Sequence, residues 1–204
     1  MRVKRLVAIW TALVLSTLAL AGFDIQSSTA QTTLQLVPQT IQLDVNSTIV
    51  LDLVITEVTG LYGVQAHLQF DPDVLEVVDV DPTREGVQIE SGTFPAPDFV
   101  ALNKVDNLAG TIDYAVTQLA PREPREGSGV VAQITVRAKR PSTTQIEIVK
   151  FILTDTAASA IDAVGKNGQI EVRQNVPWLL YAAGGVLALL IAGGVGYAVI
   201  LGRK

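Results

Sequence analysis

The chain of 204 residues contains no cysteine. Disulfide bonds, thiol nucleophiles and metal sites with sulfur ligands are therefore excluded. It contains a single histidine, His67, so a Ser-His-Asp triad would need this residue as its base. Neither Gly-x-Ser-x-Gly nor His-Glu-x-x-His occurs, and the sequence holds no phosphate-binding glycine loop and no EF-hand loop. We therefore predict that the protein is not an enzyme and has no catalytic residue, cofactor or metal ion of its own.

Two pairs of closely spaced aspartates are the remaining candidates for acid and base catalysis. Asp71 and Asp73 flank a proline, and Asp79 and Asp81 precede one. Aspartate beside proline is typical of turns, where the carboxylate accepts backbone hydrogen bonds. We interpret both pairs as structural.

Aromatic residues make up only 5% of the chain. Both tryptophans, Trp10 and Trp178, lie near its ends. A carbohydrate-binding surface usually needs several exposed rings that stack on sugars. The central part has few rings, most of them in positions expected to face a core: Tyr62, Phe70, Phe94, Phe99, Tyr114 and Phe151. Direct carbohydrate binding is therefore kept only as an alternative function.

An uncharged apolar run near the start indicates a signal peptide. Residues 6–22 follow the basic residues Arg2, Lys4 and Arg5 and lead to a small-residue sequence at 28–30. We expect cleavage after Ala30, which makes residues 1–30 the signal peptide. The alternative is a retained transmembrane helix, but the run is short for one and the small residues favour cleavage.

A second apolar run, residues 176–202, contains no charge and, at about 1.5 Å per residue, is long enough as a helix to cross a membrane core of about 30 Å. Arg203 and Lys204 follow it, and basic residues stay on the cytoplasmic side. We predict a single-pass protein of the cell membrane, with residues 203–204 as its cytoplasmic tail. Small residues recur every four positions in the span and suggest a homodimer through Gly184, Ala188, Ala192 and Gly196.

Residues 31–175 then form one domain outside the membrane. This part holds nineteen acidic and ten basic residues, a net charge near −9. Such a surface repels phosphate backbones, so we expect no nucleic-acid partner. The sequence Asn46-Ser47-Thr48 matches the acceptor pattern for glycosylation, although a turn before the next strand explains it equally well.

Apolar and polar residues alternate through this domain, which predicts β-strands. The clearest strands are residues 49–56, 64–70, 112–117 and 130–139, and shorter candidates are 40–45, 74–80, 99–103, 146–151 and 169–173. Nine strands without a convincing helix indicate an all-β fold, an antiparallel β-sandwich. Residues 120–129 are polar and rich in proline and glycine, so we interpret them as a surface crossover between two strands.

Four segments, in the same order along the chain, resemble the cohesin family. The first, Gly63 to Val78, contains a strand that ends in Phe-Asp-Pro and continues with Val-Leu-Glu. The others are residues 107–115, 129–139 and 153–172, so the resemblance extends over residues 34–173. It implies a nine-stranded jelly-roll sandwich that binds dockerin modules, with any calcium carried by the dockerin, and a role in polysaccharide catabolism.

The resemblance also implies that the partner binds one sheet face. The corresponding positions are Gly63, Gln65, His67, Gln69, Asn103, Asp113, Ala115 and Thr117. Gly63 and Gln65 stand where dockerin binders often carry Asn and Asp, which leaves the identity of the partner open. We expect this face to be a mixed donor and acceptor surface with little apolar area. A surface domain with a structural or adhesive role and an unrelated protein partner is a further alternative.

Overall fold

A computed structural model describes residues 31–174, and this part of the chain is all-β. Within this range no helix is long and apolar enough to cross a membrane. The expected signal peptide, the expected transmembrane helix and its stripe of small residues lie outside the described residues. The prediction of an all-β sandwich is confirmed.

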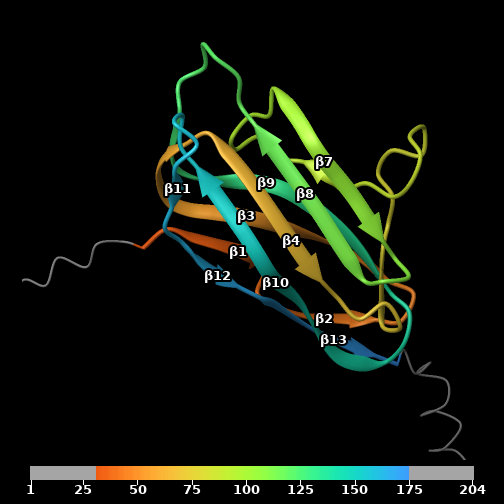
Figure 1. Ribbon diagram of the computed structural model, residues 1–204. Helices are drawn as coiled ribbons and strands as arrows, with labels where there is room; N and C mark the ends of the chain where they lie inside the picture. The colour runs from red at the N-terminus through yellow and green to blue at the C-terminus, as the bar shows by residue number, and fades with distance from the viewer. Residues whose placement is uncertain (1–30, 175–204) are drawn as a thin grey trace, which may run out of the picture. The chain divides into compact units, whose positions relative to one another are not determined.

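Two sheets make up the sandwich (Figure 1). The six-stranded sheet runs β12-β1-β3-β9-β5, with β6 paired to β9. Its strands are β1 (Thr33–Val37), β3 (Thr48–Leu61), β5 (Leu75–Val77), β6 (Glu90–Ser91), β9 (Arg125–Ala138) and β12 (Val164–Lys166). The seven-stranded sheet runs β2-β13-β10-β4-β8-β7, with β11 paired to β10. Its strands are β2 (Thr40–Asp44), β4 (Gly63–Gln69), β7 (Phe99–Asp106), β8 (Thr111–Thr117), β10 (Ser142–Thr154), β11 (Ala160–Ile161) and β13 (Gly168–Arg173).

The strands of residues 31–174 are more numerous than the nine expected. β1, β6, β11 and β12 were not predicted, because three of them have only two or three residues and show no alternation. The pairing is also not wholly antiparallel, since β1 pairs with β12, and β2 with β13, in parallel.

Alternation builds the core. In β4, and in β3 as far as Ile55, every second side chain points between the sheets; among them are Leu51, Leu53, Ala66 and Leu68, all at most 1% exposed. Tyr114 of β8 is fully buried, and its hydroxyl donates to Ser91 Oγ of β6 at 2.8 Å, which joins the two sheets. Because one face of each strand is buried in the core, its opposite face is the one exposed to solvent.

The expected turn residues have structural roles. Asp71 Oδ1 accepts the backbone N–H of Asp73 at 2.9 Å, and Asp79 Oδ1 accepts that of Gln88 at 3.0 Å. Both carboxylates thus hold turns, as predicted. Asn46 is exposed in the turn between β2 and β3 with a φ of 69°.

The crossover after β8 is shorter than predicted. Arg125 already pairs with Leu61, and Gly129 with Ile55, so residues 125–129 extend β9. Residues 118–124 carry the chain from the seven-stranded sheet to the six-stranded one. The glycines of the segment are compatible with the strand because its pairing with β3 is interrupted by bulges.

Candidate partner-binding face

The outer surface of β7, β8, β4 and β10, which we call the binding face, consists of side chains from four adjacent strands. Figure 1 views these strands from the front, with β4 and β8 at the centre. The register places its residues in four rows, in the strand order β7, β8, β4, β10. The rows are Phe99, Thr117, Gly63 and Thr154; then Leu102, Ala115, Gln65 and Ile152; then Lys104, Asp113, His67 and Lys150; and finally Asp106, Thr111, Gln69 and Glu147.

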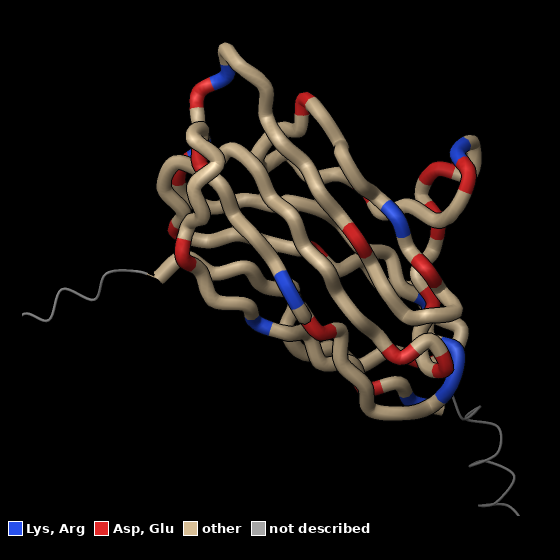
Figure 2. The backbone as a smooth tube through the Cα atoms, in the orientation of Figure 1, with Lys and Arg blue, Asp and Glu red and all other residues tan. Residues whose placement is uncertain are grey.

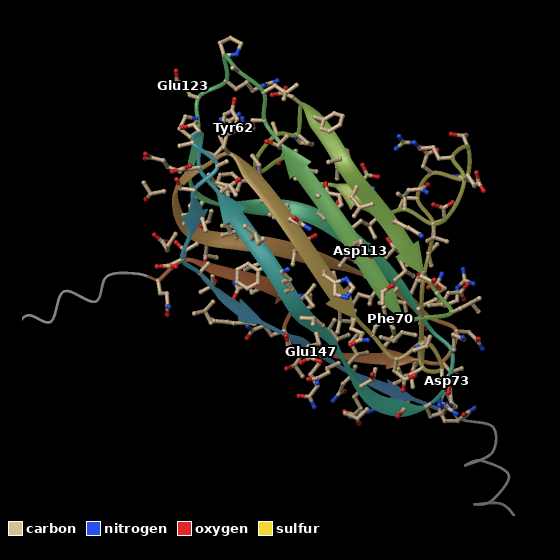
Figure 3. The ribbon with its side chains drawn as sticks, in the orientation of Figure 1. Tyr62, Phe70, Asp73, Asp113, Glu123 and Glu147 are labelled. Atoms are coloured by element: carbon tan, nitrogen blue, oxygen red, sulfur yellow. The ribbon has the colours of Figure 1, made fainter. Side chains whose placement is uncertain are left out.

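The third and fourth rows are charged. His67 Nδ1 and Asp113 Oδ1 lie 2.7 Å apart across β4 and β8, and both side chains are more than one-third exposed. Lys104 and Lys150 lie at the two ends of the same row, and neither forms an ion pair within residues 31–174. Figure 3 labels Asp113 on β8 and Glu147 on β10, and Figure 2 shows the charged positions along these strands.

The first and second rows are largely apolar, contrary to the expectation of little apolar area. Phe99 is 53% exposed, Leu102 40% and Ile152 37%. Isolated exposed apolar side chains are ordinary, but several in adjacent rows of one sheet face form a patch suited to an interface. The binding face therefore has an apolar half and a charged half.

A shallow recess of about 210 Å³ lies in the apolar half. The residues around it include Gly63, Gln65, Ala101, Ala115, Ile152 and Thr154. Gly63 has no side chain and Ala115 only a methyl group, so the surface sinks between their larger neighbours. The Thr154 hydroxyl closes one side: a Cβ on Gly63 would lie 2.7 Å from its Oγ1.

Asn103 does not lie on this face, which corrects one expected site residue. Its Oδ1 accepts the backbone N–H of Ile89 at 3.0 Å, and its Nδ2 donates to the Ile89 carbonyl at 2.7 Å. The cause is a β-bulge between Val100 and Leu102, which adds one residue to β7. Strict alternation from Phe99 would turn Asn103 outward, but the bulge turns Leu102 and Lys104 outward instead.

The other expected site residues are brought together. The binding face includes Gln65, His67, Gln69, Asp113, Ala115 and Thr117. Gly63 occupies an outward position of β4 as well, although it is buried. The Thr117 hydroxyl is engaged, because it donates to the Gln118 carbonyl at 2.9 Å. Their role in binding stays a prediction.

Several residues of the face were missed. They are the apolar residues of the patch, Phe99, Leu102 and Ile152, and the two lysines, Lys104 and Lys150. A second bulge, between Ile148 and Lys150, sets the phase of β10. Bulges leave no period in the sequence, so alternation alone places Leu102, Lys104, Lys150 and Ile152 wrongly.

Two aspartates, Asp106 in the fourth row of the face and Asp98 just before β7, are held ionised by backbone groups. Asp98 Oδ2 accepts the N–H of Leu119, and Arg122 donates to Oδ1 at 2.7 Å; the backbone bond and then the arginine lower the pKa of Asp98. The N–H groups of Ala109 and Leu108 donate to Asp106 Oδ1, each at 2.9 Å, and lower the pKa of that carboxyl.

Residues 31–174 hold no cluster of metal-ligating side chains and one exposed aromatic ring. This range contains no group of three or more His, Asp or Glu side chains placed to hold a metal ion. Of its six aromatic side chains only Phe99 is exposed, so the stacked platform expected of a carbohydrate-binding surface is not formed there.

The family model of the cohesin domain matches residues 34–172. The chain belongs to the cohesin family. A search of functionally curated proteins finds no match.

Solved cohesin structures share this fold at low sequence identity. A non-cellulosomal cohesin from Archaeoglobus fulgidus is 14% identical, with a TM-score of 0.57 over 71% of this chain and 92% of its own. A type II cohesin domain from the cellulosome of Acetivibrio cellulolyticus is 17% identical, with a TM-score of 0.60 over 69% and 95%. A type I cohesin–dockerin complex from Clostridium thermocellum is 16% identical, with a TM-score of 0.57 over 71% and 94%.

Proposed function

We propose that this cohesin is a docking module that binds a dockerin through its binding face. The observation that carries the proposal is the open outer surface of β7, β8, β4 and β10, with an apolar half beside a charged half. A specific protein interface usually combines apolar side chains with polar and charged ones in this way. Several solved relatives are described as cohesin–dockerin complexes, which supports the choice of partner.

The proposal includes the place of the module in the cell. The signal peptide and the apolar segment 176–202 would export the cohesin and tether it to the membrane, with the domain outside. Few residues separate Arg173 from this segment, so the binding face would stay close to the membrane surface. A dockerin-bearing enzyme of polysaccharide catabolism would be held at the cell surface.

Calorimetric titration tests the docking function. The full chain, solubilised in detergent, is titrated with dockerin modules encoded by the same genome, with calcium and with a chelator. We expect tight binding of at least one dockerin, and its loss in the chelator, because the calcium belongs to the dockerin.

The matched variants are His67→Ala, on the binding face, and Gln42→Ala, on β2 at the far end of the same sheet. The first should weaken binding and the second should not. If no dockerin binds, while polysaccharide is retained on a column of the same protein, the docking function is wrong and the carbohydrate-binding alternative gains support.

A further inference from the structure

We propose that the recess beside Gly63 and Ala115 is the anchor site of the binding face, and that it takes an aliphatic side chain of the partner. The two lysines of the third row then receive carboxylates of the same partner. The inference rests on the proposed docking function and specifies the chemistry that the docked module must present.

The shape of the recess selects for an aliphatic group. Its volume is about 210 Å³. An enclosed apolar cavity of roughly 150 Å³ binds benzene, so an open recess of this volume can receive the end of a leucine-sized side chain. The wall includes the Ile152 side chain and the Ala115 methyl group, with Phe99 and Leu102 exposed in the same two rows. A buried anchor surrounded by weaker contacts is the usual source of most binding energy in an interface.

Polar groups fix the position of the anchor. The Thr154 hydroxyl and the Gln65 amide lie at the recess, and Gln65 is exposed. These groups can form hydrogen bonds with the partner's backbone next to the docked side chain. Such bonds favour one orientation of the partner, which apolar contact alone does not.

Two ammonium groups of the face are available to carboxylates of a partner. Asp113 is paired with His67, and Asp106 is engaged by two backbone N–H groups. Lys104 and Lys150 form no ion pair within residues 31–174, and they stand among three carboxylates of the face, those of Asp106, Asp113 and Glu147. Carboxylates of the partner would therefore complement this row.

The distance between the recess and the lysines of the third row can be estimated. The third row lies about three residues along the strands from the centre of the recess, or roughly 10 Å at about 3.4 Å per residue. A helix lying along the strands rises about 1.5 Å per residue, so its aliphatic and acidic residues would be about seven positions apart. Residues seven apart lie on the same helical face, so one helix can supply both.

The test fills the recess without touching the core. Ala115→Leu places a larger side chain on the outer face of β8. Gln42→Leu adds the same side chain at an exposed position of β2, in the same sheet but outside the binding face. With a dockerin that binds the full chain in detergent, we expect Ala115→Leu to weaken the affinity at least tenfold. Gln42→Leu should change it less than threefold.

Charge reversal tests the pairing of the two lysines with carboxylates of the partner. Lys150→Glu should weaken the affinity at least fivefold, and replacing the facing acidic residue of the dockerin by lysine should restore it. Circular dichroism and thermal unfolding of each variant report whether the fold is kept.

The outcomes separate the two proposals. If the wild-type chain binds no dockerin, the docking function fails and this inference fails with it. If a dockerin binds and Ala115→Leu leaves its affinity unchanged, the recess is not the anchor site, although the docking function stands. Equal losses in Ala115→Leu and Gln42→Leu would likewise overturn the anchor role, because added bulk outside the binding face would then be sufficient.

Discussion

His67 Nδ1 and Asp113 Oδ1 are 2.7 Å apart in the middle of the binding face, where β4 and β8 pair directly. The two side chains are 37% and 39% exposed, so water screens the pair in the free protein. A docked partner would exclude that water and strengthen the interaction. The pair therefore matters more in a complex than in the folded chain alone.

A double-mutant cycle on this pair should show the difference. We expect His67→Ala and Asp113→Ala each to change the free energy of unfolding by less than about 1 kcal/mol. Their coupling energy should be larger in dockerin binding, measured by calorimetry, than in urea unfolding. Equal coupling energies in the two measurements would contradict a role of the pair in the interface.

Asn103 should be a stability residue. Its amide makes two hydrogen bonds to the backbone of Ile89, so Asn103→Ala leaves a half-buried N–H and C=O without their partner. We expect a loss of about 2 kcal/mol in the free energy of unfolding, measured by urea denaturation. Gln65→Ala, on an exposed side chain of β4, is the control and should leave stability within about 0.5 kcal/mol.

Gly110 should tolerate no side chain. Its φ is 70°, and a Cβ would collide with the Phe70 carbonyl of the Asp-Pro turn. Gly60 has a similar φ of 74° but open space around it, which makes it a matched control. We expect Gly60→Ala to cost about 1 kcal/mol, from backbone strain alone, and Gly110→Ala to cost at least about 2 kcal/mol more in urea denaturation. Similar losses in both variants would show that the turn relaxes around the new methyl group.

Acid should destabilise the fold through Asp98 and Asp106. Both have a pKa lowered in the folded state by backbone N–H donors, so the folded state binds protons less readily than the unfolded one. Their contribution is complete above the ordinary aspartate pKa and is lost as the pH falls through the lowered folded values. Unfolding measured from pH 6 down to pH 2 should show a smaller acid loss in Asp98→Asn and Asp106→Asn than in the wild type. An unchanged profile in both variants would refute the assignment.

The central strands could be predicted from the sequence because their alternation is uninterrupted. β4 and β8 pair residue for residue from Gly63 with Thr117 to Gln69 with Thr111, so every second side chain faces outward as expected. Their predicted site residues consequently share one face. The family resemblance added the partner, which no pattern of the residues specifies.

The flanking strands could not be predicted in the same way. Alternation through β7 would place Phe99, Ala101 and Asn103 on one face, whereas the bulge after Val100 puts Phe99 and Leu102 there. Whether a residue is absorbed in a bulge depends on its pairing with the neighbouring strand, which is a tertiary contact. The apolar half of the face and both lysines are for this reason visible only in the structure.

The two bulges also bear on how such a module could change partners during evolution. A single-codon insertion or deletion in β7 or β10 exchanges the side chains that a partner meets, while the regular pair β4 and β8 is left intact. One such event replaces all the outward side chains of a strand beyond the insertion at once. Point substitutions would have to replace them one by one. Changes in strand length at the margins of the face are thus a direct route from one recognition code to another within a conserved sandwich.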